Sequence, residues 1–393
     1  TDSHAPYVYD YFSETLRDRK SFNQEFRAVS DSADFLQDKF LEWVVGANYL
    51  ELKETNLKKD DGLYGDPSDP YGPYASASSS SSRYKSSNFS VFGNLDYFLS
   101  SSLKFSLGLR WEDWEANYSD SAKEAFNPTD KMSGGKVSLI KSMAGGANIY
   151  ASLAKGYKQG GFNLGLGLDT GSTNKNLAYD PEFLTNYEVG INTKLMDSKI
   201  NFNGVLFYSD REDQQVLIST QTDPSDPNTF SFLTQNAAEG VNQGLEINMD
   251  MDITESLQMF FNLGILKTEI KNWQSRKDLE GRAQAHAPER SYALGFNWTP
   301  TTNTYLAVDF TGNSSFYYSD SHNNKSKSYT LTNLNLGYVK NKWNYELWAR
   351  NIFDEYYAVR GFYFGNEAPN FIDTLYERHG DPRHIGVSIR YDF

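Results

Sequence analysis

The sequence predicts an all-β protein, a transmembrane antiparallel β-barrel with about 15 strands in this chain. Apolar and polar residues alternate along many segments, and short and long connections between these segments also alternate. Aromatic residues are abundant, with 27 Tyr and 26 Phe among 393 residues, although the mean hydropathy is only -0.62. A barrel wall explains this combination, because it needs an apolar face toward lipid, a polar face toward water and aromatic girdles at both interfaces.

The alternation has the period of two residues that is typical of β-strands. It is clear in segments 41–49, 89–99 and 103–111, and clearest in the last segment, 385–393. There Ile385, Val387, Ile389, Tyr391 and Phe393 share one face, and Gly386, Ser388, Arg390 and Asp392 share the other. Such segments place one face in lipid and the other in a polar lumen.

The connections indicate a topology. Short turns are expected at 100–102, 144–146, 197–198, 254–256, 300–302 and 340–341. Long polar stretches fall between them, at 55–87, 117–134, 162–181, 220–228, 271–288, 314–327 and 357–381. Outer-membrane barrels have short periplasmic turns and long extracellular loops, so Phe393 is expected on the periplasmic side. Because single-chain bacterial barrels have an even number of strands, a further strand is expected, either before this chain or within the weak segment 7–15.

Several classes of protein are disfavoured. No run of 18 apolar residues occurs, which argues against a transmembrane helix. The absence of cysteine excludes disulfides and thiolate metal sites, and a net charge of -14 argues against nucleic acid as a partner. The five histidines show no metal-ligand spacing and no catalytic motif is present, so neither a zinc site nor an enzyme is predicted.

Seven local patterns, in order along the chain, resemble those of TonB-dependent receptor barrels. The most specific is the segment 155–163, Lys-Gly-Tyr-Lys-Gln-Gly-Gly-Phe-Asn. The others are Gln24-Glu25-Phe26-Arg27 with Ser30 and Trp43 to Gly46; Pro181-Glu182 with Asn186-Tyr187-Glu188; Asn236-Ala237 with Gly244-Leu245-Glu246; Ala287-Pro288-Glu289; Asn351-Ile352-Phe353-Asp354 with Tyr356-Tyr357; and the terminal Phe393.

The resemblance implies that residues 1–393 are the C-terminal portion of a barrel of about 22 strands closed by a plug. This chain contains neither a plug domain nor a TonB box, so it is expected to be either a fragment or a shortened relative. The implied function is import across the bacterial outer membrane, with an Fe(III)-siderophore as ligand by family precedent and cobalamin, haem or an oligosaccharide as alternatives. The implied partners are the TonB complex, reached through the missing N-terminal region, the barrel-assembly machinery, and outer-membrane lipid with lipopolysaccharide. No intrinsic cofactor is expected.

Two groups of residues are candidates for ligand binding, since they precede or occupy long loops where aromatic rings can stack on a ligand. The alternative for each is structural: the first group would shape the barrel rim and meet the plug, and the second would pack loop against loop or form the outer interfacial belt. The first group is Tyr157, Lys158, Gln159, Phe162 and Asn163, and the second is Tyr317, Tyr318, Phe362 and Tyr363. The resemblance further implies that Ile389, Tyr391 and Phe393 act as an assembly signal as well as closing the barrel.

One cluster of carboxylates could hold Ca²⁺, which prefers oxygen ligands. It consists of Asp60, Asp61, Asp66 and Asp69. The spacing does not match an EF-hand, and acidic residues are common in solvated turns.

Two other functions remain as alternatives to an importer. A self-contained diffusion porin of about 16 strands would result if segment 7–15 supplied one further strand. A structural or adhesion barrel in a surface complex is the other. The repeated alternation would also suit a soluble β-sandwich, but strands of about ten residues and long loops disfavour it.

Overall fold

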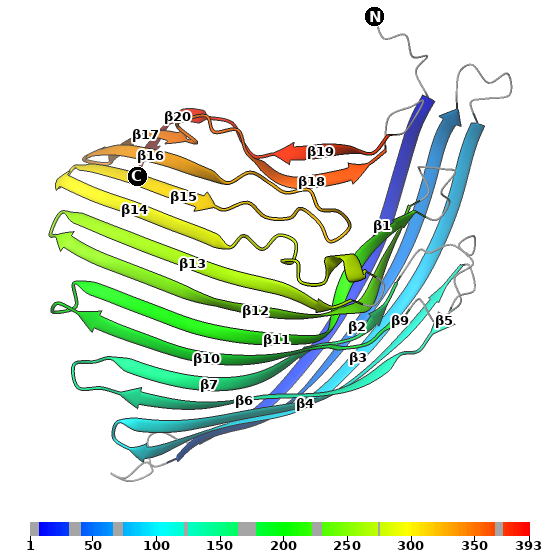
Figure 1. The fold of residues 1–393 in the computed structure, drawn as a ribbon, viewed down its shortest axis with the longest axis horizontal. Coiled ribbons are helices and arrows are strands. Elements are labelled where there is room, and N and C mark those ends of the chain that lie inside the picture. The colour runs from blue at the N-terminus through cyan, green and yellow to red at the C-terminus, as the bar shows by residue number, and fades with distance from the viewer. Residues whose placement is uncertain are drawn as a thin grey trace, which may run out of the picture.

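The computed structural model of the chain describes residues 8–30, 41–65, 74–121, 125–163, 178–221, 230–273, 276–365 and 372–393. Its main feature is one large antiparallel sheet (Figure 1). Fifteen strands follow one another in the order β1-β2-β3-β4-β6-β7-β10-β11-β12-β13-β14-β15-β16-β17-β20, and the short β5 pairs with β4. The predicted all-β fold and strand number are therefore confirmed. No helix in these ranges is long and apolar enough to span a membrane.

The strands have very different lengths. Those of the first part of the sheet are β1 (Val8–Val29), β2 (Leu41–Gly65), β3 (Tyr74–Ser100), β4 (Leu103–Asp120), β5 (Ala125–Phe126), β6 (Thr129–Ser142), β7 (Asn148–Lys158), β10 (Glu182–Leu195), β11 (Ile200–Gln221), β12 (Phe230–Thr254) and β13 (Leu257–Asn272). The later strands are β14 (Arg290–Thr301), β15 (Thr304–Asn313), β16 (Tyr329–Lys340), β17 (Trp343–Arg350) and β20 (His384–Tyr391). Two small hairpins, β8 (Gly161–Phe162) with β9 (Ala178–Tyr179), and β18 (Ala358–Phe364) with β19 (Thr374–His379), lie outside the main sheet.

The six predicted short turns are confirmed, because each joins two paired strands. Left-handed backbone conformations make two of them possible. Gly145 and Gly146 have φ of 96° and 84° between β6 and β7, and Asp197 has φ of 54° between β10 and β11. Glycine adopts such angles without steric cost, and aspartate tolerates them better than most residues.

The two faces of the sheet differ in polarity as predicted. On one face, which we call the apolar face, large side chains meet across strands in register, as in the row Leu336, Leu347 and Val387. They are left uncovered, and Val387 is 68% exposed. On the opposite or polar face, Ser90 pairs in register with Glu112, and Ser138 with Ser152. An uncovered apolar face on a continuous hydrogen-bonded ladder is suited to lipid.

The first strands are longer than predicted, and the loop predicted at 55–87 is wrong over most of its length. Its ends form the upper halves of β2 and β3, which pair in register from Leu41 with Tyr97 to Tyr64 with Tyr74. The segment carries Ser, Lys and Asp on both faces, so it lacks the apolar alternation that marks a strand in the membrane. The weak segment 7–15 is likewise no separate strand, because β1 runs continuously from Val8 to Val29.

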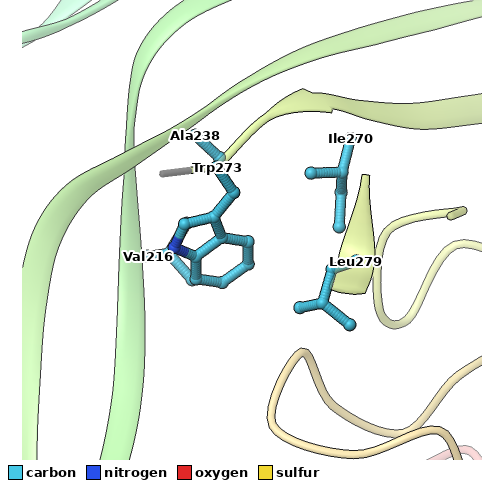
Figure 2. Packing of buried hydrophobic residues seen from close by; sticks show 5 residues of the cluster. All are labelled: Val216, Ala238, Ile270, Trp273 and Leu279. Atoms are coloured by element: carbon cyan, nitrogen blue, oxygen red, sulfur yellow. The ribbon is translucent and has the colours of Figure 1, made fainter. Parts of the chain in front are cut away.

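The later strands are short, and their connections fold into compact structure. The connection after β13 contains a 3-10 turn, η3 (Lys277–Leu279). Its Leu279 packs with Trp273, Ile270, Val216 and Ala238 in a buried cluster (Figure 2). A second cluster joins Phe316 and Tyr318, from the loop between β15 and β16, to Ala358 and Leu375 of the β18–β19 hairpin. These loops therefore have small hydrophobic cores of their own.

Candidate functional site

The candidate residues of segment 155–163 lie at the end of β7, in a recess and a rim on the polar side of the sheet. The recess has a volume of about 650 Å³ and is bordered by Arg110, Glu112, Tyr157 and Gln159. The hydroxyl of Tyr157 donates to Glu112 Oε2 at 3.0 Å and accepts from Arg110 Nε at 3.2 Å. Arg110 and Glu112 also form an ion pair at 2.7 Å. Arg110 and Glu112 compensate each other's charge, so Tyr157 is part of the wall's own network, while Lys136 and Lys155 also line the recess.

Phe162 belongs to an aromatic cluster above this network. Its ring centroid lies 5.1 Å from that of Tyr118, 5.7 Å from Tyr84 and 6.0 Å from Phe126. The fully buried Trp114 and Met132 pack against it. This arrangement joins β3, β4, β5 and β8, and it leaves little of Phe162 for direct contact with a ligand.

The rim beside this cluster is tied together by side chains that bond to backbone. The buried Asn163 donates from Nδ2 to the carbonyl of Thr234 at 2.8 Å, and its Oδ1 accepts from the Thr234 N–H at 2.6 Å. Asn236 repeats this pattern, because its Nδ2 donates to the carbonyl of Asp180 at 2.7 Å and its Oδ1 accepts from the Asp180 N–H. Each asparagine side chain therefore bonds to both backbone groups of a residue far away in the sequence, as the backbone of a neighbouring strand would.

Glu182 completes the rim. One of its oxygens forms an ion pair with Arg211, and the other accepts from the N–H of Gln215 at 3.0 Å. Gln215 in turn donates from Nε2 to the carbonyl of Gln159 at 2.9 Å. Three of the recognised patterns, at 155–163, 181–182 and 236–237, therefore meet at one place that the sequence did not predict. Lys158 is exposed and lies opposite Glu182 in the register of β7 and β10.

Tyr317 and Tyr318 lie in the loop between β15 and β16, which we call the capping loop (residues 314–328). Tyr318 is 2% exposed and its hydroxyl donates to Glu377 of β19 at 2.5 Å. Burial, together with this bond to Glu377, raises the pKa of the Tyr318 hydroxyl far above its ordinary value. The ring of Tyr317 lies under two cations, with Arg282 Cζ 4.4 Å and Lys325 Nζ 4.1 Å from its centroid.

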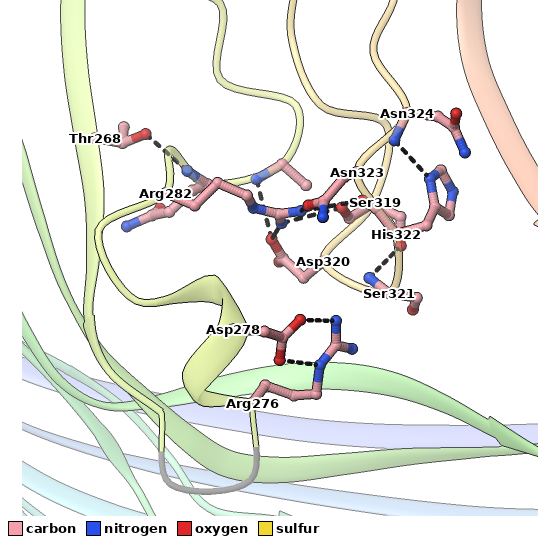
Figure 3. A network of polar contacts seen from close by, with 12 residues as sticks. Thr268, Arg276, Asp278, Arg282, Ser319, Asp320, Ser321, His322, Asn323 and Asn324 are labelled. Carbon is pink, nitrogen blue, oxygen red and sulfur yellow. Dashed lines mark hydrogen bonds and ion pairs between the residues drawn. The ribbon is translucent and has the colours of Figure 1, made fainter.

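Arg282 anchors the capping loop, a role that was not predicted from the sequence. Its guanidinium donates to the carbonyls of His322 at 3.0 Å and Ser319 at 3.1 Å (Figure 3). It also donates to the side chains of Asn323 and Asp320, both at 2.8 Å. The contact with Asp320 joins residues 38 positions apart, so no local pattern could have predicted it.

Phe362 and Tyr363 lie in β18, and both are exposed on the surface of the hairpin. Phe362 is next to the guanidinium of Arg360, whose Cζ lies 4.9 Å from the ring centroid. Tyr363 lies on the other side of the strand, 5.7 Å from the ring of His322. These are therefore the ring-bearing candidates that remain most accessible.

The terminal residues Ile389, Tyr391 and Phe393 are exposed along one line of the apolar face. The rings of Trp343 and Tyr391 lie 4.8 Å apart, and those of Tyr391 and Phe393 lie 5.2 Å apart. In the described chain β20 pairs with β17 alone. The terminal aromatics thus stand next to an open strand edge, and their role in assembly stays a prediction.

The proposed calcium ligands divide into two pairs. Asp66 and Asp69 lie outside the described residues. Asp60 and Asp61 are consecutive residues of β2 and so point to opposite faces, and Asp60 accepts a hydrogen bond from Ser13 at 2.7 Å. No cluster of three potential metal ligands occurs within the described ranges, and the calcium site stays a prediction.

A groove of about 1200 Å³ lies elsewhere, over the apolar face. Leu139, Leu153, Val189 and Leu206 contribute to its lining. Since these side chains belong to the uncovered apolar surface, we assign this groove to contact with lipid and not to a polar ligand.

Comparisons with known proteins agree with this architecture. The family described as TonB dependent receptor-like, beta-barrel matches residues 1–352. The metal-pseudopaline receptor CntO of Pseudomonas aeruginosa is 20% identical over 272 residues, which are 67% of this chain and 34% of that protein. The ferric yersiniabactin uptake receptor FyuA from Yersinia pestis has a similar structure, with a TM-score of 0.73 and 17% identity over 98% of this chain and 55% of that one.

Two further solved structures share the fold. The siderophore receptor PiuA from Acinetobacter baumannii has a TM-score of 0.71 at 17% identity, over 96% of this chain and 56% of that one. The copper transporter OprC has a TM-score of 0.70 at 13% identity, over 97% of this chain and 58% of that one. The chain thus spans about half the length of the solved structures that it matches, and about a third of the curated relative.

Proposed function

This chain belongs to the TonB-dependent receptor-like β-barrel family of the Gram-negative outer membrane, and we propose that it is the C-terminal part of an import receptor for an Fe(III)-siderophore. The observation that carries the proposal is the family match over residues 1–352, together with a sheet that has one apolar and one polar face. Members of this family are transporters and not enzymes, which agrees with a site built from structural ion pairs and rings.

The choice of ligand is supported by what the similar proteins are named for. FyuA is a ferric yersiniabactin uptake receptor and PiuA a siderophore receptor, whereas OprC is a copper transporter and CntO a metal-pseudopaline receptor. The common element is a metal carried alone or in a chelate. An Fe(III)-siderophore is the most frequent case among them, and we propose it for this chain.

The complete receptor would contain more chain than these 393 residues. β1 and β20 are the two edges of the described sheet, and each has one unpaired side there. Unpaired strand edges are disfavoured in lipid. We propose that the remaining strands of a barrel of about 22 strands lie between these edges, around a plug. The TonB complex would act on that plug region, and the barrel-assembly machinery and lipopolysaccharide are proposed as further partners.

In this proposal the chain supplies the wall and part of the extracellular vestibule. The ligand would bind above the rim formed by Asn163, Glu182 and Asn236, next to the capping loop and the β18–β19 hairpin. Because the rim is cross-linked by hydrogen bonds, it would stay in place while the plug is remodelled from the periplasmic side. The receptor binds and releases its ligand unchanged, so no chemical step is required of these residues.

Uptake of radioactive iron supplied as a siderophore complex tests the proposal. Cells that produce the receptor should take up the iron only when TonB is functional, and the purified receptor should have an intact mass well above the 44.6 kDa of this chain. Uptake that persists without TonB, together with passive conductance in lipid bilayers, would instead establish a diffusion porin.

A further inference from the structure

The β18–β19 hairpin has one face that is held in place by the capping loop. Ala358 and Leu375 pack against Phe316 and Tyr318, and the bond from the Tyr318 hydroxyl to Glu377 crosses the same contact. The ring of Tyr318 also lies so close to Gly361 that a Cβ there would collide with it. This face is therefore fixed, and the hairpin is a rigid projection.

The opposite face of the hairpin carries cross-strand pairs, in which Arg360, Arg378 and Phe362 are exposed, whereas Tyr376 is half-buried with its hydroxyl enclosed. Arg360 lies opposite Arg378 in register, and Phe362 lies opposite Tyr376. Both arginines are exposed. We call the four residues Arg360, Arg378, Phe362 and Tyr376 the arginine–aromatic face. Figure 1 shows the hairpin beyond the ends of β16 and β17, on the side toward which β1, β2 and β3 extend.

Among the described residues, the two arginines have no carboxylate partner. Acidic residues outnumber Lys and Arg by 51 to 37. Neither Arg360 nor Arg378, however, takes part in an ion pair among the described residues, whereas Arg282 and Arg276 each do. The nearest acidic residue on β19, Glu377, is engaged by Tyr318 on the other face. Like charges directly opposite on two strands destabilise their pairing. An anion that binds both guanidinium groups would remove this cost.

The aromatic residues of the face indicate what else the anion carries. The ring of Phe362 lies beside Arg360, and Tyr376 is the cross-strand neighbour of Phe362. Planar rings favour stacking on rings of a ligand, and guanidinium groups bind anionic oxygens through paired hydrogen bonds. A further exposed arginine, Arg350, ends β17, the strand that precedes the hairpin.

We infer that the arginine–aromatic face is the part of the receptor that selects its ligand, and that this ligand is an anionic, aryl-bearing iron chelate of the catecholate class. The inference rests on the proposed function, since it assigns the substrate class of that receptor. Arg360 and Arg378 bind the negatively charged oxygens at the surface of the chelate, and the exposed Phe362, opposite the half-buried Tyr376 in register, contacts its rings. An uncharged hydroxamate chelate lacks both features.

The test compares two iron probes on the complete receptor purified from outer membranes. One probe is the triply anionic iron(III) tris-catecholate, and the other is an uncharged iron(III) trihydroxamate, with binding followed by quenching of protein fluorescence. We expect Arg360→Gln and Arg378→Gln each to weaken tris-catecholate binding about tenfold, and the double variant about 100-fold. Phe362→Leu should weaken it about threefold to tenfold. Arg390→Gln, an exposed arginine at the other end of the barrel, is the matched control and should bind like the parent.

The outcomes separate the inference from the proposed function. A double variant that binds tris-catecholate as tightly as the parent would overturn the inference, as would a parent that prefers the trihydroxamate. Loss of both probes in the double variant would also overturn it, because the arginines would then hold structure and not select charge. If the parent binds neither iron probe, the proposal of a siderophore receptor fails instead.

Discussion

The two sides of the sheet extend above the membrane in different ways. On the first side, β3 has 27 residues and β2 has 25, and the ladder between them continues without a break. On the other side, β17 has only 8 residues. There the capping loop and the β18–β19 hairpin, which fold around Tyr318 and Phe316, form the part of the protein above the short strands.

This difference determines where stability is concentrated. In the long strands, many backbone hydrogen bonds each contribute a little, and the side chains around them are mostly exposed or half-buried. On the short-strand side, a few buried side chains keep the loops in place. Arg282, for example, bonds to four residues of the capping loop. Single substitutions should therefore have large effects in the loops and small effects in the long strands.

Arg282→Ala should have the largest effect. The Arg282 side chain is 8% exposed and its ion-pair partner Asp320 is 22% exposed, so removal leaves a partly buried carboxylate without its cation. We expect the capping loop to lose about 2–4 kcal/mol of local stability. Amide hydrogen exchange in residues 314–328 measures this. The control is Arg276→Ala, whose ion pair with Asp278 is more exposed and should leave exchange in the capping loop unchanged. Equal exchange in both variants would contradict the anchoring role.

Tyr318→Phe should have a smaller effect. The ring would keep its packing against Phe316, at 5.9 Å between centroids, but the hydrogen bond to Glu377 would be lost. A hydrogen bond to a charged group contributes roughly 1.5–3 kcal/mol, and Glu377 is exposed enough to be rehydrated, so we expect about 1–2 kcal/mol. Exchange of the β18–β19 amides reports this loss. Tyr317→Phe is the matched control, because its ring keeps its contacts with Arg282 and Lys325, and it should behave like the parent.

Acidification should loosen the capping loop through His322. Burial lowers the pKa of His322 in the folded protein, and the nearby positive charge of Arg282 acts in the same direction. The unfolded loop therefore binds a proton more readily than the folded loop, and stability is present above a pH of about 6.5 and lost as pH falls below it. Exchange in the capping loop should rise at low pH in the parent and much less in His322→Gln. A pH response that is identical in both would exclude His322 as its source.

The sequence predicted the part of the fold that lies in the membrane and missed the part above it. Alternation at segments such as 103–111 and the six short turns were sufficient to predict the strands, because lipid on one face imposes a strict pattern. The upper half of β3, with its serine run, faces water on both sides, so no pattern distinguishes it from a loop. Likewise, the pairing of Arg360 with Arg378 depends on the register of a hairpin, which the sequence around either residue does not encode.

Arg19→Met, on the long-strand side, should have the smallest effect. Arg19 bonds to Glu54 from Nε at 2.7 Å, and its side chain is 55% exposed whereas that of Glu54 is 12% exposed. Arg17, 3.5 Å from Glu54, remains as a cation in the variant, and the exposed Arg19 contributes about 0–1 kcal/mol. Glu54 would also keep the hydrogen bond from Asn56 at 2.9 Å. We expect a loss of about 0.5 kcal/mol or less, which disappears in concentrated salt because exposed charges are screened. Hydrogen exchange in β1 and β2 measures it. A loss as large as that of Arg282→Ala would show that the long strands, too, depend on single side chains, and the contrast between the two sides of the sheet would fail.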